Sequence, residues 1–275
     1  MALEDIKTVR VPPAPEIAVD VAGSGEVILF IHGIGGDRSN WSDQLLACPV
    51  GYQGVSVDLR GYGASDDFDG PFRYSDVCGD LLRVLEYLSA EQAHIVGLSM
   101  GGVVAMEFWK KAPERLKSLV LCDTGPGVAN DRTPEDAQAF LDARQKPLLD
   151  GLSPSDIAPK LAKSLVSPKA PDRAYQRLVQ SMSSLRKDTY LKSLEAMVMY
   201  RSPPDFTKIR TPTLIIVGED DMLTPPAVSE RMAEKIPNAK LVIVPEAGHL
   251  SNIEQPEAFN AALFAFLQAT DDLSA

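Results

Sequence analysis

Short apolar runs alternate along the chain with longer segments in which apolar residues recur at helical spacing. Continuous apolar runs of this kind are typical of strands that are buried on both faces of a sheet. Their alternation with helix-length segments predicts an α/β fold, in which a parallel sheet carries helices on both faces. The runs cover residues 27–31, 55–57, 94–96, 119–121, 214–217 and 241–244, and the helix-length segments cover 75–88, 102–111, 227–236 and 256–267.

Two regions depart from this alternation. Near the start, segments 7–11 and 17–21 flank a proline-rich stretch and predict a hairpin at the edge of the sheet, where proline is tolerated. Between Thr124 and Thr211 the chain shows only helical patterns, punctuated by proline and glycine, which predicts a helical insertion. We therefore assign residues 1–127 and 206–275 to a core domain and residues 128–205 to a helical cap.

Composition places the chain among soluble globular enzymes, with 45% hydrophobic and 24% charged residues in 275 positions. The formal net charge of −11 disfavours attraction to nucleic acid or to an anionic membrane surface. No stretch approaches the roughly 20 apolar residues of a membrane span, and acidic residues precede the first apolar run. We therefore expect a cytoplasmic protein that binds neither nucleic acid nor membranes.

Cysteine and histidine are too few for the common structural metal sites. Cys48, Cys78 and Cys122 are odd in number and lack Cys-x-x-Cys spacing, which argues against a disulfide framework and against zinc. Cys122 ends an apolar run, where a buried, inert thiol is expected. The chain contains only 3 histidines, so we expect no metal centre.

A candidate nucleophile stands in the pentapeptide Gly97-Leu98-Ser99-Met100-Gly101. An apolar run with strand-forming residues precedes it, and an apolar segment suited to a buried helix follows it. In a strand–turn–helix of this pattern, small residues on either side let the chain turn sharply and expose the serine hydroxyl. Ser99 is therefore the predicted nucleophile.

A serine hydroxyl needs a histidine to accept its proton and a carboxylate to orient that histidine. His249 follows the apolar run that ends at residue 244, and small residues before it suit a loop that returns over the sheet. The residues after the run 214–217 offer Glu219, Asp220 and Asp221 as the carboxylate, and Asp123 after the run 119–121 is a rival.

The oxygen of a tetrahedral intermediate also needs preorganised N–H donors. The Met100 amide, directly after the nucleophile, is one candidate. The Ile34 amide, in the glycine-rich turn 32–36, is the other. His32 in the same turn is interpreted as a structural residue, because one general base suffices.

Side chains of the cap are candidates for binding the substrate. Met182, Met197 and Met199 are predicted to form a flexible apolar wall over it. Four arginines of the cap are candidates for binding a substrate carboxylate, although arginines on exposed helices are usually solvated. They are Arg132, Arg144, Arg173 and Arg177.

These motifs together resemble the α/β-hydrolase superfamily over nearly the whole chain. The matching segments are the turn 32–36, the stretch 58–66, the serine pentapeptide, the acid loop at Asp221 and the pair Gly248-His249. The resemblance implies a mostly parallel eight-stranded sheet with an inserted helical cap. It also selects Asp221 as the carboxylate, which gives the chain order Ser99, Asp221, His249 that is typical of this superfamily.

Within the superfamily, segments 121–124 and 248–256 are similar to the 3-oxoadipate enol-lactonase and carboxylesterase group. The resemblance implies a serine hydrolase that opens a carboxylic ester or lactone without a cofactor. Three alternatives remain: hydrolysis of a carbon–carbon bond in a vinylogous diketone, a peracid-forming side activity, and a small-molecule binding scaffold without turnover. Haloalkane dehalogenases and epoxide hydrolases resemble this fold but have an aspartate where Ser99 stands. The sequence does not predict the oligomeric state.

Overall fold

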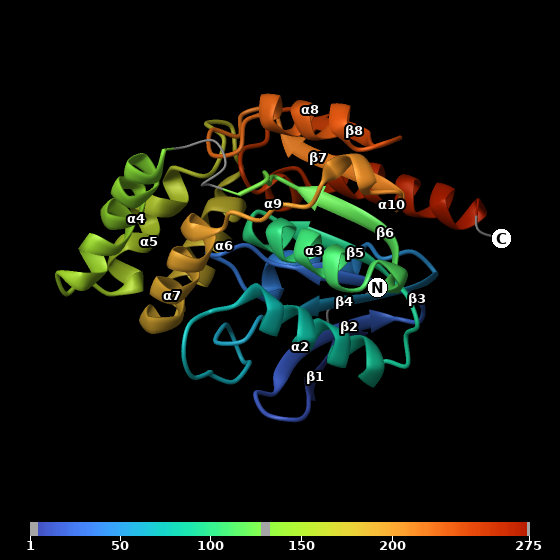
Figure 1. Cartoon of the computed structure of the whole chain (residues 1–275), viewed down its shortest axis with the longest axis horizontal. Helices are drawn as coiled ribbons and strands as arrows, with labels where there is room; N and C mark the ends of the chain where they lie inside the picture. The colour runs from blue at the N-terminus through green and yellow to red at the C-terminus, as the bar shows by residue number, and fades with distance from the viewer. Residues whose placement is uncertain (1–4, 128–132, 274–275) are drawn as a thin grey trace.

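The computed structural model describes residues 5–127 and 133–273, which form one eight-stranded sheet flanked by helices (Figure 1). The strands lie in the order β1-β2-β4-β3-β5-β6-β7-β8. The pairs β1–β2 and β2–β4 are antiparallel, and all other neighbours are parallel. The predicted mostly parallel sheet with its edge hairpin is confirmed. The strands are β1 Lys7–Val11, β2 Ile17–Gly23, β3 Gly25–Ile31, β4 Gly51–Val57, β5 Ala93–Leu98, β6 Leu116–Cys122, β7 Thr213–Gly218 and β8 Lys240–Val244.

Successive side chains of the central strands point to opposite faces of the sheet, and each face has its own apolar cluster. On one face, Leu29 and Ile95 pack with residues of α2, α3 and α8. On the other, Phe30 and Val96 pack with residues of α1 and α10. Helices therefore cover both faces, as predicted. They are α1 Ser42–Leu46, α2 Tyr74–Tyr87, α3 Met100–Lys111, α8 Pro226–Lys235, α9 Ser251–Glu254 and α10 Pro256–Asp272.

The last strand differs from its prediction. The apolar run 241–244 indicates burial on both faces, but β8 is half-exposed, and Ile243 retains 40% of its accessible surface. The reason is topological: β8 pairs only with β7 and forms an edge of the sheet. An apolar run thus predicts the strand correctly but does not report its place in the sheet.

In the described residues between β6 and β7, four α-helices gather at one side of the core (Figure 1). They pack partly on each other, through a small cluster that includes Leu141, Tyr190 and Leu194. The structure has no strand in the described part of this interval. The cap boundaries at residues 128 and 205 stay a prediction, and residues 128–132 lie outside the described part. The helices are α4 Pro134–Leu149, α5 Pro154–Lys163, α6 Asp172–Ser183 and α7 Lys187–Met199.

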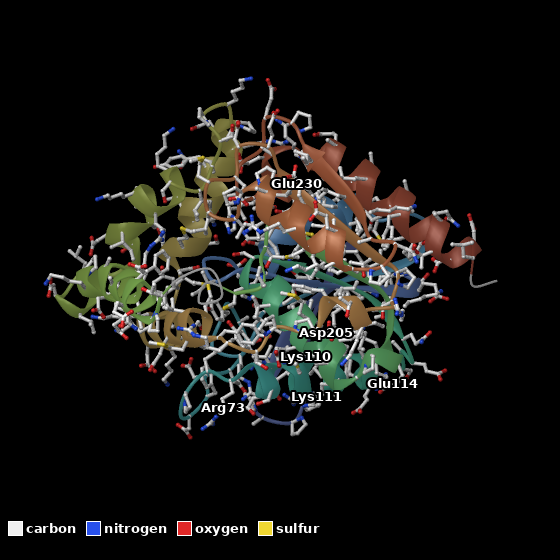
Figure 2. The ribbon with its side chains drawn as sticks, turned by 45° about the horizontal axis from the view of Figure 1, so that its top comes forward. Arg73, Lys110, Lys111, Glu114, Asp205 and Glu230 are labelled. Carbon is white, nitrogen blue, oxygen red and sulfur yellow. The ribbon has the colours of Figure 1, made fainter. Side chains whose placement is uncertain are left out.

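Charged side chains lie over the outer surface of the core. Figure 2 shows Arg73, Glu114 and Glu230 directed away from the ribbon, and all three are exposed. No helix in residues 5–127 or 133–273 has the length and apolar character to cross a membrane.

Candidate active site

Ser99 occupies a sharp turn between β5 and α3. Its backbone has φ 53° and ψ −117°, a conformation that residues other than glycine rarely adopt. Gly97 and Gly101 allow this turn. A Cβ atom on Gly97 would lie 2.2 Å from the Gly101 oxygen, and one on Gly101 would lie 2.3 Å from the Ile31 oxygen. The glycines predicted to flank the serine are therefore required by close backbone contacts on both sides.

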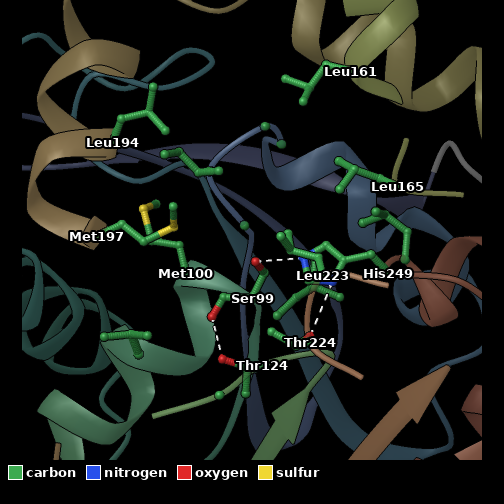
Figure 3. Close-up of a pocket in the computed structure, with 18 of the residues that line it drawn as sticks. Ser99, Met100, Thr124, Leu161, Leu165, Leu194, Met197, Leu223, Thr224 and His249 are labelled. Atoms are coloured by element: carbon green, nitrogen blue, oxygen red, sulfur yellow. Dashed lines mark hydrogen bonds between the residues drawn. The ribbon is translucent and has the colours of Figure 1, made fainter. Parts of the chain in front are cut away.

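Two hydrogen bonds hold the strained turn in place. The Ser99 N–H donates to the Cys122 oxygen at the end of β6, at 2.9 Å. The Thr124 hydroxyl donates to the Ser99 carbonyl oxygen at 2.7 Å (Figure 3). The backbone of the serine is thus fixed while its side chain stays free to face His249.

Ser99, His249 and Asp221 form a continuous chain of polar contacts. The Ser99 Oγ lies 2.9 Å from Nε2 of His249, and the His249 Nδ1 lies 2.9 Å from Oδ2 of Asp221. The side chains come from the turn after β5, the loop after β8 and the loop after β7. His249 and Asp221 are 3% and 1% exposed, so solvent hardly competes for these contacts.

The acid is held by its own loop. Asp221 Oδ1 accepts the N–H groups of Leu223 and Thr224 at 2.8 and 3.0 Å, and Oδ2 accepts the Thr224 hydroxyl at 2.7 Å. Burial by itself raises the pKa of Asp221, but the His249 charge and these hydrogen bonds outweigh it and lower the pKa. Asp221 therefore stays ionised at neutral pH.

The pKa of the His249 imidazole shifts in the opposite direction to that of Asp221. Burial lowers the pKa of His249, but the charge of Asp221 and its hydrogen bond outweigh burial, so the pKa is raised above 6.5. A proton taken from Ser99 is thus stabilised on the ring by the adjacent carboxylate. This geometry is suited to general base catalysis at a serine hydroxyl.

The rival carboxylate Asp123 is buried but does not contact the imidazole directly. Its Oδ1 accepts the Gly218 N–H at 2.8 Å, and its Oδ2 accepts the hydroxyl and N–H of Ser251 at 2.6 and 3.1 Å. Burial and the nearby charge of Asp221 raise the pKa of Asp123 to about 8. Asp123 therefore ties the acid loop to the histidine loop, while Asp221 makes the contact with His249.

The two candidate oxyanion donors lie beside the nucleophile. Met100 is the first residue of α3, whose first amides have no acceptor within the helix. Ile34 lies in a turn closed by a 3.1 Å hydrogen bond from Gly36 N–H to the Gly33 oxygen. This turn is close to the nucleophile, because a Cβ on Gly33 would lie 3.2 Å from the Ser99 Cβ. Ile34, Met100 and Ser99 all line one cavity.

The His32 side chain holds the turn that contains Ile34 in place through two hydrogen bonds. The Leu59 N–H donates to its Nε2 at 3.1 Å, so the ring proton resides on Nδ1 and is donated to the Gly33 oxygen at 2.7 Å. The ring also packs edge-on against Tyr62, with centroids 4.8 Å apart. Complete burial lowers the pKa of His32 and keeps it neutral. These contacts agree with the structural role expected for His32.

The loop that carries His249 is bonded directly to the cap. The His249 N–H donates to the Leu165 oxygen at 2.8 Å. The approach is close enough that a Cβ on Gly248 would lie 2.5 Å from the Ser167 nitrogen. Glu254 joins both sides: it accepts the N–H groups of Ser167, Gly248 and Leu250 at 2.8, 3.0 and 3.2 Å. The position of the imidazole therefore depends on a segment of the cap.

Ser99 and His249 lie at the base of a cavity of about 380 Å³ between core and cap. Figure 3 shows them facing each other, with Leu161, Leu194 and Met197 across the cavity from them. The lining is mostly apolar, and its polar groups come both from the core, as with Thr124 and Thr224, and from the cap, as with Arg144 and Tyr190. A cavity of this kind is typical of a small-molecule site.

Two of the three predicted cap methionines line this cavity. Met182 packs against the turn beside Ser99, since its Cε lies 2.5 Å from the place of a Cβ on Gly35, and Met197 lines the wall formed by α7. The prediction for Met199 is wrong, because its side chain is 43% exposed and does not line the cavity. Residues two apart on a helix point in nearly opposite directions, so Met197 and Met199 cannot share one face.

The arginines of the cap that were candidates for binding a substrate carboxylate lie in different surroundings. Arg144 lines the cavity, whereas Arg173 is exposed beside a separate surface cleft. Arg177 forms an ion pair with Asp43 at 2.6 Å. Arg132 lies outside the described residues.

Sequence reasoning did not assign roles to Thr224 or Glu254. Thr224 is three residues after Asp221, and its hydroxyl donates to the Asp221 carboxylate. An aspartate that accepts backbone N–H groups two or three residues later is a recognised local turn, so part of this contact could be expected from the sequence. No comparable signal exists for Glu254, because its three partners come from the cap and from both sides of His249.

Comparison with known proteins places this geometry in a family context. Residues 26–256 match the family model described as alpha/beta hydrolase fold. The 3-oxoadipate enol-lactonase 2 of Acinetobacter baylyi is 28% identical over 262 residues, which cover 93% of this chain and 95% of the relative. The 2-hydroxy-6-oxononadienedioate/2-hydroxy-6-oxononatrienedioate hydrolase of Paraburkholderia phymatum is 30% identical over 264 residues, covering 90% of this chain and 89% of the relative.

Solved structures agree with the observed fold. A thermophilic esterase from Thermogutta terrifontis, in a malate-bound structure, superposes with a TM-score of 0.86 at 28% identity, over 96% of this chain and 99% of the esterase. Other relatives are named putative non-heme bromoperoxidase and putative carbamate hydrolase. The names of these relatives therefore refer to different reactions and substrates.

Proposed function

The chain belongs to the α/β-hydrolase family, and from this premise we propose that it is a serine hydrolase that cleaves a carboxylic ester or lactone. The observation that carries the proposal is the unbroken contact from Asp221 through His249 to Ser99, with 2.9 Å at each step, at the base of an apolar cavity. Similarity to an enol-lactonase and an esterase supports this substrate class.

In the proposed mechanism, His249 Nε2 accepts the hydroxyl proton as Ser99 Oγ attacks the substrate carbonyl carbon. The Ile34 and Met100 N–H groups donate to the developing oxyanion. Collapse of the tetrahedral intermediate expels the alcohol, which takes the proton from His249 and leaves an acyl group on Ser99. His249 then deprotonates a water molecule that attacks the acyl carbon, and the free acid leaves as Ser99 recovers its proton.

A fluorophosphonate probe tests the nucleophile directly. The proposal expects Ser99 Oγ to displace fluoride from phosphorus, which gives one stable mass adduct on an active-site peptide. Ser99→Ala protein should remain unlabelled and should lose turnover on a panel of p-nitrophenyl esters and lactones of graded size. Folded wild-type protein that neither reacts with the probe nor turns over any member of the panel would contradict the proposal and favour the binding scaffold.

A second candidate is hydrolysis of a carbon–carbon bond in a vinylogous diketone. It is supported by the relative named 2-hydroxy-6-oxononadienedioate/2-hydroxy-6-oxononatrienedioate hydrolase. The same serine and histidine would serve both reactions, so Ser99→Ala does not separate them. The ratio of kcat/KM for an enol-lactone to that for a ring-fission diketone does, and the proposal expects the lactone to be preferred.

A further inference from the structure

The cavity above Ser99 has an unusual charge for this chain. The protein carries a net charge of −11, yet the cavity lining among the described residues contains two arginines, Arg144 and Arg231, and no aspartate or glutamate. Arg144 enters from α4 of the cap, and Arg231 from α8 of the core. A cationic side chain in a mostly apolar cavity is suited to binding an anionic group of a ligand.

Arg144 has no carboxylate partner in the described part of the chain, unlike Arg177, which is paired with Asp43. Its guanidinium lies 5.0 Å from the centroid of the Phe140 ring. A guanidinium on an aromatic face is held in orientation while its N–H groups remain able to donate. The stacking therefore holds a fork of donors in place at the cavity wall without neutralising its charge.

Tyr190 adds a second donor next to this guanidinium. Its ring is 2% exposed and lines the same cavity. Burial raises the pKa of the Tyr190 phenol, and the adjacent Arg144 guanidinium only partly opposes that rise. The phenol is therefore protonated at neutral pH. A neutral O–H next to a guanidinium is a suitable combination for holding a carboxylate.

We propose that Arg144 and Tyr190 bind a carboxylate on the substrate, so that the preferred ester or lactone carries an acid group remote from the bond that is cleaved. This inference rests on the proposed function, and it specifies the substrate class of that site. Binding pairs the Arg144 guanidinium with a carboxylate, while the reactive carbonyl of the same substrate reaches Ser99, which lines the same cavity. A neutral substrate of equal length leaves Arg144 without a counter-charge.

The test compares two series of p-nitrophenyl esters that differ only at the far end of the acyl chain. One series contains the half esters of succinic, glutaric, adipic and pimelic acids, and the other contains neutral acyl chains of the same lengths. Wild-type protein should prefer the half ester at one length. Arg144→Gln should lower kcat/KM for that half ester about 10- to 100-fold, mainly through KM, as expected for a charge-assisted hydrogen bond. For the neutral ester, kcat/KM should change by less than about threefold, which is smaller than the effect of losing a charge-assisted hydrogen bond.

Further variants separate a binding role from a structural one. Arg144→Lys should keep part of the preference, because the charge remains but the fork is lost. Tyr190→Phe should reduce the preference by about 3- to 10-fold. Arg173→Gln is the matched control, since it makes the same change on an exposed cap arginine and should leave both series unaffected.

Binding to inactive protein distinguishes this inference from the proposed function. Calorimetry with Ser99→Ala protein should detect binding of adipate that weakens with added salt, and the Ser99→Ala, Arg144→Gln double variant should lose it. A wild type without any esterase activity but with this binding would overturn only the proposed function. An equal loss on both ester series in Arg144→Gln, or an unchanged ratio between them, would overturn the carboxylate site.

Discussion

The core and the cap contribute to the site in different ways. Ser99 stands on the turn after β5, and Asp221 and His249 stand on the loops after the adjacent strands β7 and β8. Backbone hydrogen bonds hold each of them. The cap supplies mainly apolar side chains to the cavity, one to three from each of α4, α5, α6 and α7. Backbone geometry therefore positions the proposed reacting groups, whereas side chains of the cap line the cavity that would receive the substrate.

The largest effect is expected from the reacting groups of the core. Ser99→Ala or His249→Ala should lower kcat by about 10³–10⁶-fold, because the nucleophile and the base act as one unit. Steady-state kinetics on a p-nitrophenyl ester measures this, with circular dichroism to verify folding. Combining both substitutions should add little to either. A fully additive double variant would contradict the shared role.

The next effect separates the two buried aspartates. Asp221→Asn should lower kcat by roughly 10³–10⁴-fold, because the amide no longer stabilises a protonated imidazole. Asp123→Asn is the matched control and should stay within about tenfold of wild type, since Asp123 contacts Gly218 and Ser251 rather than His249. Equal losses in both variants would mean that Asp123 shares the orienting role.

The pH profile gives an independent measure of the same pair. His249 must be neutral to accept a proton, so kcat/KM should fall as the pH decreases through its pKa, which lies above 6.5. Asp221 is the charge that raises this pKa. Residual activity of Asp221→Asn should therefore have its acid limb at lower pH than wild type. A limb that stays in place would contradict the electrostatic role of Asp221.

An intermediate effect is expected where the two regions join. Glu254→Ala would leave three backbone N–H groups without their acceptor, at a cost of about 3 kcal/mol of unfolding free energy. Urea denaturation measures it. Glu257→Ala, on the exposed side of α10, is the control and should change stability by less than about 0.5 kcal/mol. Equal stability of the two variants would mean that the Glu254 contacts are dispensable.

The smallest effect is expected from the cap wall. Met197→Ala enlarges the cavity and should shift the ratio of kcat/KM for long to short acyl esters by about 3- to 10-fold towards long chains. Met199→Ala removes the same side chain from the exposed face of α7 and should leave the ratio unchanged. A shift of similar size in both would show that the cap acts through its overall stability rather than through the wall.

The sequence predicted those features that depend on neighbouring residues. The serine turn is local, since Gly97, Ser99 and Gly101 carry its strain and its close contacts within five positions. Buried strands likewise produced apolar runs that identify them. These two patterns were sufficient to predict a parallel sheet with helices on both faces, whereas the number of strands came from the resemblance to the superfamily.

Features that depend on distant neighbours were missed. The exposure of β8 follows from its pairing on one side only. Asp123 and Asp221 both follow strands, so the residues alone left the carboxylate open. The resemblance to the superfamily selected Asp221, and the structure brings Asp221 to His249. Met199 has the residue type expected of the wall but lies on the other face of α7.

The bond from the His249 N–H to the Leu165 oxygen has a consequence for exchanging caps between relatives. A transplanted cap must present a carbonyl oxygen at the same point, or the backbone N–H of His249 in the recipient core loses its acceptor. Chimaeras joined outside 165–167 would keep this anchor and should tolerate foreign helices. Grafts that replace the segment without presenting such an oxygen should lower turnover on every substrate, including those that the foreign cap was selected to admit.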